Sequence, residues 1–326
     1  MIDPELGLPA EPGLPPLPRG AAITVGTFDG VHRGHRVVLD ELRRHAEAAG
    51  RPAVVVTFQP HPLRVVRPQA APPLLTTPAE KRDILAETGV DYAVFLPFTP
   101  AMARLTPRQF VEHILIGRLQ LAHLIVGYDH ALGRDRTGSI DTLRELGAEL
   151  GFPVDVVSAV ELGGAVVSST RIRHALQEGD VLAAAAALGR PYSIRGPVVR
   201  GDGRGRSLGF PTANIHVGDP DKLLPLEGIY AARAALRTGY VDGVLHLGPR
   251  PTFRDAPPSI EIHLFDFDRD LYGEEVQVEF CARLREVRAF GSAAELVDAM
   301  RADREAARRV FAAGGGACSK FREELD

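Results

Sequence analysis

Two histidines, His32 and His35, stand three residues apart at the predicted start of a helix. The apolar run Ala21–Val25 precedes them and predicts a short buried strand, joined to the helix by a glycine-bearing turn. Because residues three apart share one face of a helix, both imidazoles would point at the same ligand. Backbone N–H groups and the helix dipole favour an anion at such an N-terminus. The stretch therefore predicts a binding site for a nucleotide phosphate.

Transfer of a nucleotidyl group needs no nucleophile from the protein. It needs the α-phosphate held in line and a donor for the charge that grows in the transition state, and imidazoles at a helix N-terminus provide this. The alternative is a pair of surface histidines on an ordinary helix, which the histidine spacing alone would favour. The strand and the composition of the turn reverse that preference. The turn residues that accompany the histidines are Gly26, Phe28, Asp29, Gly30 and Gly34.

A second phosphate-binding element is predicted where Ser169, Thr170 and Arg171 precede a helix over residues 172–177. Hydroxyls and a guanidinium at a helix start can clamp the β- and γ-phosphates of a nucleotide. A simple N-cap at Ser169 or Thr170 is the alternative, and in isolation it would be preferred.

Two loops of the first half follow predicted strands. Residues 57–62 contain two prolines that hold an extended loop, in which Phe58 and His61 could face a flat ligand; a proline-stiffened connection is the alternative. Asp129 lies in a glycine-punctuated loop with two arginines, for which a solvated charged loop is the alternative.

The second half has its own informative run, residues 199–214, with four glycines in nine residues and three arginines. That composition predicts a cradle for polyphosphate, although it is not a P-loop of the Gly-x-x-x-x-Gly-Lys-Ser/Thr type. Thr212 and Asn214 lie on one side of an extended segment and carry oxygens suited to Mg²⁺. A flexible glycine loop is the alternative.

Glu261 lies in a predicted strand over residues 260–265, on the opposite face from Ile260, Ile262 and Leu264. A carboxylate on a strand face that opens to a site can take the proton from an attacking hydroxyl. An exposed strand glutamate is the alternative, and the pattern alone favours it.

The elements that position these residues change character along the chain. Strand-like and helical segments alternate up to residue 188, which predicts a parallel sheet covered by helices, with ligands at the carboxyl ends of the strands. Beyond residues 189–191, short strands without intervening helices predict a small antiparallel barrel or sandwich. A final helix over residues 293–311 has Leu296, Met300 and Val310 as core candidates. We therefore expect an irregular leader (1–20), an α/β domain (21–188) and a β domain (189–326).

Composition limits the range of functions. With 326 residues and a net charge of −4, the chain offers no overall electrostatic attraction for nucleic acid or for a membrane surface. No apolar run approaches the ~20 residues of a membrane span, and the N-terminus lacks the features of a signal peptide. Cys281 and Cys318 are far apart and lack metal-ligand spacing, which fits a reducing cytoplasm and predicts no disulfide framework.

Taken together, the two signatures resemble the prokaryotic bifunctional riboflavin kinase/FAD synthetase family. The first is Gly-x-Phe-Asp-Gly-x-His-x-Gly-His, residues 26–35, and the second is Leu-Gly-Phe-Pro-Thr-Ala-Asn, residues 208–214, after a glycine–arginine stretch. The runs at 248–253, 261–267 and 270–273 are also similar to that family. The resemblance implies a Rossmann-like nucleotidyltransferase module followed by a six-stranded antiparallel barrel.

The resemblance also implies two ATP reactions. The second module would phosphorylate riboflavin to FMN, with Glu261 as general base and with Thr212 and Asn214 holding Mg²⁺. The first module would join FMN to the α-phosphate of ATP, releasing pyrophosphate and giving FAD, with His32 and His35 at the transferring phosphate. The other implied nucleotide contacts are Gly26, Phe28, Asp29, Gly30, Gly34, Asp129, Ser169, Thr170 and Arg171 in the first module, and Gly201, Gly203, Gly205, Arg206, Pro211, Thr212 and Asn214 in the second. The implied flavin contacts of the first module are Phe58, Pro60 and His61.

Two residues depart from the family pattern. His130 stands where the family usually has an aromatic residue, and His246 stands where it usually has asparagine. Both positions bear on ligand affinity more than on the type of reaction. Two alternatives stay open at this stage: a kinase whose first module only binds nucleotide, and a flavin sensor without turnover.

Overall fold

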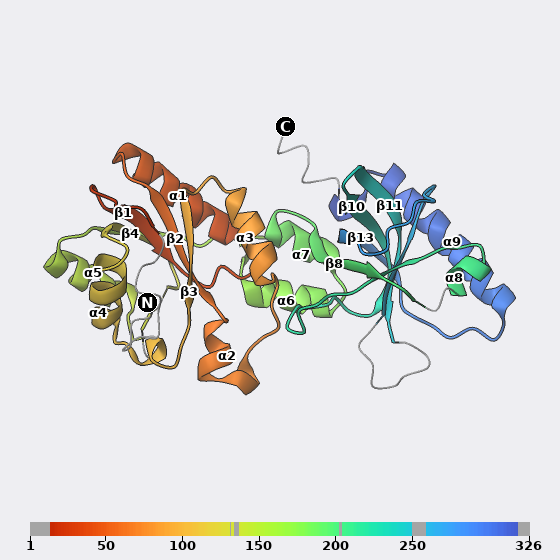
Figure 1. Cartoon of the computed structure of the whole chain (residues 1–326), viewed down its shortest axis with the longest axis horizontal. Helices are drawn as coiled ribbons and strands as arrows, with labels where there is room; N and C mark the ends of the chain where they lie inside the picture. The colour runs from red at the N-terminus through yellow and green to blue at the C-terminus, as the bar shows by residue number, and fades with distance from the viewer. Residues whose placement is uncertain (1–13, 131, 134–136, 202–203, 250–258, 319–326) are drawn as a thin grey trace. The chain divides into compact units, whose positions relative to one another are not determined.

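A computed structural model of the chain describes residues 14–130, 132–133, 137–201, 204–249 and 259–318 (Figure 1). The chain divides into two compact units, Met1–Val167 and Ser168–Asp326. Helices α6 (Ser169–Gln177) and α7 (Val181–Leu188) therefore belong to the second unit. The domain boundary after residue 188 stays a prediction.

The first unit is built on a five-stranded sheet in which every neighbouring pair is parallel. Its strands are β1 (Ala21–Val25), β2 (Ala53–Gln59), β3 (Tyr92–Pro97), β4 (Leu121–Gly127) and β5 (Val154–Val157), in the order β3-β2-β1-β4-β5. Its helices are α1 (Arg33–Ala48), α2 (Pro62–Val66), α3 (Pro78–Ala86), α4 (Pro107–Gln109), which continues as a π-helix (Phe110–Ile116), and α5 (Ile140–Leu150). Short 3₁₀ turns cover Pro68–Ala70 and Met102–Arg104, and β6 (Glu161–Leu162) pairs with β7 (Ala165–Val166). The expected Rossmann-like α/β class is confirmed.

Successive side chains of β1 and β2 enter two different apolar cores. Ile23 and Val56 pack in a core with Leu143 of α5, whereas Val55 packs in another with Leu39 of α1. A parallel sheet covered on both faces needs such continuously apolar strands, which explains the unbroken β-branched run of β2. This packing holds the N-terminus of α1 at the carboxyl end of β1, where the two histidines lie.

The second unit contains a closed six-stranded barrel, which decides between the barrel and the sandwich. Its strands are β8 (Tyr192–Val199), β9 (Ala213–Ile215), β10 (Gly228–Leu236), β11 (Gly239–Gly248), β12 (Ser259–Leu264) and β13 (Glu275–Arg285), in the order β10-β11-β12-β9-β8-β13. All pairs are antiparallel. The helices α8 (Arg204–Ser207) and α9 (Ala293–Ala312) and a 3₁₀ turn (Gly316–Cys318) complete the unit. Strand β9 overlaps the end of the glycine-rich signature, where an extended segment but no paired strand was expected.

Helix α9 packs through the face expected, because its buried residues lie three or four positions from the core candidates. Its buried residues are Ala299, Asp303 and Ala307, whereas Leu296, Met300 and Val310 are only half-buried. Asp303 accepts two hydrogen bonds from Arg285 of β13, each 2.7 Å long. Because this ion pair satisfies the carboxylate, the helix can bury a charge on the barrel beside Ala307 and Val310.

The expectation of no disulfide is wrong, because Cys281 of β13 is bonded to Cys318. The two residues are 37 positions apart, and the turn that follows α9 brings them together against the barrel. The separation of the two cysteines in the sequence does not indicate how close they are in space, because α9 spans most of the intervening residues and folds back on β13.

We expect Cys318→Ser to lower the free energy of unfolding by about 3–4 kcal/mol, because the disulfide closes a loop of this length in the unfolded chain. Urea denaturation of the oxidised protein, with and without reductant, measures the effect. Reductant should destabilise the wild type by the same amount and leave the variant unchanged. Equal stability of the wild type in both conditions would contradict the prediction.

Within the described part of the chain, no helix combines the length and the apolar character needed to cross a membrane.

Candidate active sites

His32 and His35 lie together at the N-terminus of α1, as the helical spacing predicts. His32 is the N-cap, and its Nδ1 accepts a hydrogen bond from the backbone N–H of His35 at 3.3 Å. The two rings stack with their centroids 3.6 Å apart, and Phe28 packs edge-on against His35. Because Nδ1 of His32 accepts, the neutral ring carries its proton on Nε2, which makes that atom a donor. The arrangement presents imidazole donors beside the positive end of a helix.

The turn that precedes the histidines has an unusual backbone. Phe28 and Val31 have φ values of 47° and 38°, and Gly30 has a φ of 84°. For a β-branched residue such as Val31 a positive φ is a clear outlier, and such outliers concentrate at ligand-binding turns. A Cβ on Gly34 would come within 3.2 Å of the His32 ring, so this glycine lets the imidazole lie flat against the helix start.

Asp29 anchors this turn to a neighbouring segment. Its carboxylate is 1% exposed and accepts hydrogen bonds from the backbone N–H groups of Leu75 and Thr76, at 3.1 and 3.0 Å. The Thr76 hydroxyl donates to the same carboxylate and accepts from the N–H of Gly30. Asp29 thus holds the turn in shape, and its direct contact with a nucleotide stays a prediction.

Lys81 of α3 is a second anchor, one that the sequence did not reveal. Its Nζ donates to the Thr27 carbonyl at 2.7 Å, and the Thr57 hydroxyl donates to the same oxygen at 3.0 Å. Lys81 is 7% exposed, and this burial lowers its pKa, although the charge of Asp29 acts in the opposite direction. The sequence offered one indication that Lys81 is buried. It lies four residues before Leu85, on the core-facing side of the predicted helix.

The structure gives local roles to the residues of the proline loop. Phe58 packs against Phe98 and Phe110, with ring centroids 5.4 and 6.2 Å away. His61 is the N-cap of α2, and its Nδ1 accepts from the N–H of Leu63. Pro60 is exposed and follows a cis peptide bond. All of these residues lie at or just beyond the carboxyl end of β2, and their contact with flavin stays a prediction.

The remaining residues proposed for the first module lie in two places. Asp129 is exposed in the turn after β4. Ser169, Thr170 and Arg171 form the first turn of α6, where Ser168, not Ser169 or Thr170, is the N-cap and accepts from the N–H of Arg171 at 3.3 Å. Since α6 belongs to the second unit, its place opposite the histidines stays a prediction.

In the barrel, Glu261 lies between Asn214 and His246 on neighbouring strands. The register of β12 pairs Glu261 with Asn214 of β9 on one side and with His246 of β11 on the other. The Thr212 hydroxyl donates to Glu261 Oε2 at 3.3 Å. Three residues from distant parts of the sequence are therefore brought together, and the exposed-glutamate alternative fails because Glu261 is half-buried and hydrogen-bonded.

The glycine-rich loop packs closely against this cluster. A Cβ on Gly201 would lie 2.3 Å from Asn214 Nδ2, and a Cβ on Gly205 would lie 2.3 Å from the Phe210 carbonyl and 3.2 Å from Thr212 Oγ1. Only glycine allows these approaches. The loop backbone is thereby held against the two expected metal ligands.

Other parts of the second signature are peripheral to the cluster or not described. Pro211 is exposed, and its carbonyl accepts from His263 Nδ1 at 2.9 Å. Arg206 is exposed and lies in helix α8. Gly203 lies outside the described residues, as does the Pro-Thr-Phe part of the run at 248–253.

The donor set around Glu261 fits a hard divalent cation. It combines a hydroxyl oxygen of Thr212, an amide oxygen of Asn214 and a carboxylate, and all three are oxygen ligands that Mg²⁺ accepts. Mg²⁺ keeps several waters and bridges substrate phosphates, so a small cluster of protein oxygens beside a glycine loop is sufficient.

Burial lowers the pKa of His246 below its usual 6.5; the charge of Arg285 acts in the same direction, while Glu261 and Glu227 oppose it. Below pH 6.5 the unfolded chain therefore binds more protons than the native state, and stability falls as the pH falls.

We expect His246→Asn to show a smaller loss of unfolding free energy between about pH 7.5 and about pH 5.5 than the wild type. Urea denaturation at both pH values measures this. His216→Asn, at an exposed histidine of the same unit, is the control; equal pH dependence of the His246 variant and the wild type would contradict the prediction.

The first unit has a parallel sheet with paired histidines at a strand-to-helix turn. The second has a barrel with a carboxylate among oxygen ligands. Together these features define a two-domain transferase that acts on phosphates. Comparisons with known proteins make this definition specific. A family model for FAD synthetase matches residues 14–171, and one for riboflavin kinase matches residues 188–311.

Relatives match over almost the whole chain. The bifunctional riboflavin kinase/FMN adenylyltransferase of Pseudomonas fluorescens is 39% identical, over 92% of this chain and 96% of its own. The enzyme of the same name from Escherichia coli K12 is 37% identical, over 90% and 93%. A crystal structure described as a macrolide-efflux protein from Streptococcus pneumoniae superposes with a TM-score of 0.81 at 32% identity, over 89% of this chain and 94% of that chain.

The chain belongs to the family of bifunctional riboflavin kinase/FMN adenylyltransferases. The sequence resemblance is thereby confirmed, and so is the assignment of the chain as a transferase with ATP, riboflavin and FMN as small-molecule substrates.

Proposed function

We propose that the barrel unit transfers the γ-phosphoryl group of MgATP to riboflavin, and that the parallel-sheet unit then transfers the adenylyl group of a second ATP to the FMN produced. The observation that carries the proposal is the cluster of Glu261, Thr212 and Asn214 in the barrel, because a kinase needs a base and oxygen ligands in one place. The products are ADP and FMN in the first step, and pyrophosphate and FAD in the second.

In the kinase step, Glu261 accepts the proton of the ribityl 5′-hydroxyl as that oxygen attacks the γ-phosphorus. The hydrogen bond from Thr212 orients the carboxylate, which keeps one oxygen directed at the substrate. Bound Mg²⁺, held by Thr212 and Asn214, would neutralise charge on the transferring phosphate. The backbone of residues 201 and 204–206 supports the phosphates from the other side.

In the adenylyl-transfer step, the FMN phosphate is the nucleophile and needs no base, because it is already an anion at neutral pH. His32 and His35 donate to the oxygens of the α-phosphate as charge builds up there. The dipole of α1 adds to this stabilisation, since the histidines occupy its first turn. Ser169, Thr170 and Arg171 would hold the pyrophosphate that leaves.

We propose the cytoplasm as the place of both reactions, since each of them consumes ATP. The Cys281–Cys318 disulfide would then be an exception to the rule that cytoplasmic thiols remain reduced.

Incubation of the protein with riboflavin and MgATP, followed by chromatographic separation of the flavins, tests the proposal. We expect FMN to rise first and FAD to follow. A parallel incubation with FMN and ATP separates the alternatives: a kinase with a silent first module produces no FAD there, and a flavin sensor produces neither product in either reaction.

A further inference from the structure

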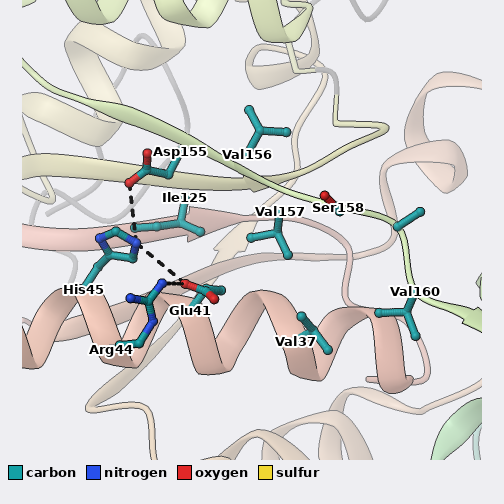
Figure 2. Close-up of a pocket in the computed structure, with 11 residues that line it drawn as sticks. Val37, Glu41, Arg44, His45, Ile125, Asp155, Val156, Val157, Ser158 and Val160 are labelled. Carbon is teal, nitrogen blue, oxygen red and sulfur yellow. Dashed lines mark hydrogen bonds and ion pairs between the residues drawn. The ribbon is translucent and has the colours of Figure 1, made fainter.

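A second cluster of ligand-type side chains lies at the far end of α1 from His32. It consists of His45 in the last turn of α1, His123 of β4 and Asp155 of β5. His123 Nε2 is 2.7 Å from Asp155 Oδ2, and His45 Nε2 is 3.5 Å from the same oxygen (Figure 2 shows His45 and Asp155). One donor atom from each residue lies within 4.8 Å of the others. Two imidazoles and a carboxylate therefore converge on one point.

The spacing of these atoms suits a first-row divalent metal. A tetrahedral zinc ion with ligand bonds near 2.0–2.1 Å places neighbouring ligand atoms roughly 3.3 Å apart. The His45–Asp155 separation already fits, and the His123–Asp155 contact needs only a small rotation of the half-exposed Asp155 side chain to open. Glu41, one turn earlier on α1, has Oε2 3.7 Å from His45 Nε2 and can supply a fourth ligand atom.

The surroundings favour a cation and give it access. The C-terminal end of a helix carries partial negative charge, and His45 lies in the last turn of α1. A cavity of about 500 Å³ adjoins the cluster and is lined by Glu41, His45 and Asp155 together with apolar residues such as Ile125 (Figure 2). Arg44 pairs with Glu41 at the rim, so Glu41 must exchange this partner to reach a metal.

We propose that His45, His123 and Asp155 bind one Zn²⁺ ion or a similar first-row divalent metal, with Glu41 or water as the fourth ligand. Imidazole and carboxylate ligands select zinc and its neighbours over Mg²⁺, so this site differs in chemistry from the oxygen cluster of the barrel. The ion ties the end of α1 to β4 and β5. His45 lies thirteen positions after His32 along the helix, about 20 Å away, so the ion takes no part in adenylyl transfer.

Metal titration of the full-length chain tests the site directly. After treatment with a chelator, Zn²⁺ is titrated by calorimetry and Co²⁺ by visible absorption, which is intense when the metal is tetrahedral. We expect one site per chain, a tetrahedral cobalt spectrum and a higher Tm with zinc. His45→Gln combined with His123→Gln should weaken binding at least about tenfold and abolish the zinc-dependent Tm shift.

Two further variants test whether histidines elsewhere in the same unit hold the metal instead. His113→Gln, at an exposed histidine of the same unit, should bind zinc as the wild type does. His32→Asn combined with His35→Gln should also retain binding, because the stacked pair at the other end of α1 is the competing imidazole site. If the cluster is only an ion pair between Asp155 and the histidines, neither metal binds saturably. That result, or unchanged binding in the His45/His123 variant, overturns the proposal.

Discussion

Glu261→Gln abolishes the conversion of riboflavin to FMN while leaving the conversion of FMN to FAD intact; this is the largest effect we expect from a single substitution. Glutamine has the size of glutamate, and its carbonyl can still accept the hydrogen bond from Thr212, so the barrel should be undisturbed. What is lost is the ability to take up a proton. Loss of a general base costs on the order of 10²–10⁴ in rate.

Initial rates of FMN formation, measured with saturating MgATP, give the size of the effect. The FMN-to-FAD rate of the same preparation is the internal control, because the first unit has its own core and sheet. A variant that keeps more than about a tenth of the kinase rate would refute Glu261 as the base. A fall in both activities would instead point to misfolding of the chain.

The second large effect is expected from His32→Asn combined with His35→Gln. Asparagine is a good N-cap, so it replaces the capping role of His32 on α1 while it removes the imidazole. Glutamine keeps a hydrogen-bonding side chain of moderate size at His35. Removal of donors to a transition-state oxyanion costs about 10²–10³ in rate for each donor, so FAD synthesis from FMN should fall by at least that factor.

The test of this prediction is the rate at which the double variant forms FAD from FMN and ATP. Its rate of riboflavin phosphorylation is the control and should not change. His32→Asn alone separates capping from chemistry: it should keep the wild-type Tm and lose most of the adenylyl transfer. Normal FAD synthesis in the double variant would contradict the role assigned to the histidines. A lower Tm in the single variant would show that the imidazole is needed for the structure of α1.

At the turn between β1 and α1, the spacing of residues in the sequence predicts the two site histidines but not the long-range contacts that hold the turn in shape. Two histidines three residues apart share a helix face by geometry alone, and the structure stacks them. Asp29 was expected to contact the nucleotide, which stays a prediction; the role that the sequence did not indicate is its hydrogen bonding to the N–H groups of residues 75 and 76. Lys81 reaches the same turn from another helix. Contacts between residues so far apart in the chain leave no local pattern in a sequence.

In the barrel, too, local sequence pattern predicts a site residue but not its neighbours in space. Alternation of apolar and polar residues put Glu261 on the face away from the core, but it could not exclude solvent exposure. Strand register decides that Asn214 and His246 flank it. The three-residue strand β9 was missed because glycine and proline dominate its surroundings and because it is too short for periodicity to detect.

By itself, the sequence determined the α/β first half, the β-rich second half, the two signatures and the family they indicate, because these depend on local periodicity and on residue types at short spacing. The tertiary structure alone decided the strand order of the barrel, the Cys281–Cys318 bond, the ion pair that buries Asp303 of α9 and the cluster of His45, His123 and Asp155. Each of these depends on strand order or on the packing of a helix against distant strands. Such arrangements are set by how whole elements bury their apolar faces, and the order of residues within one element does not encode them.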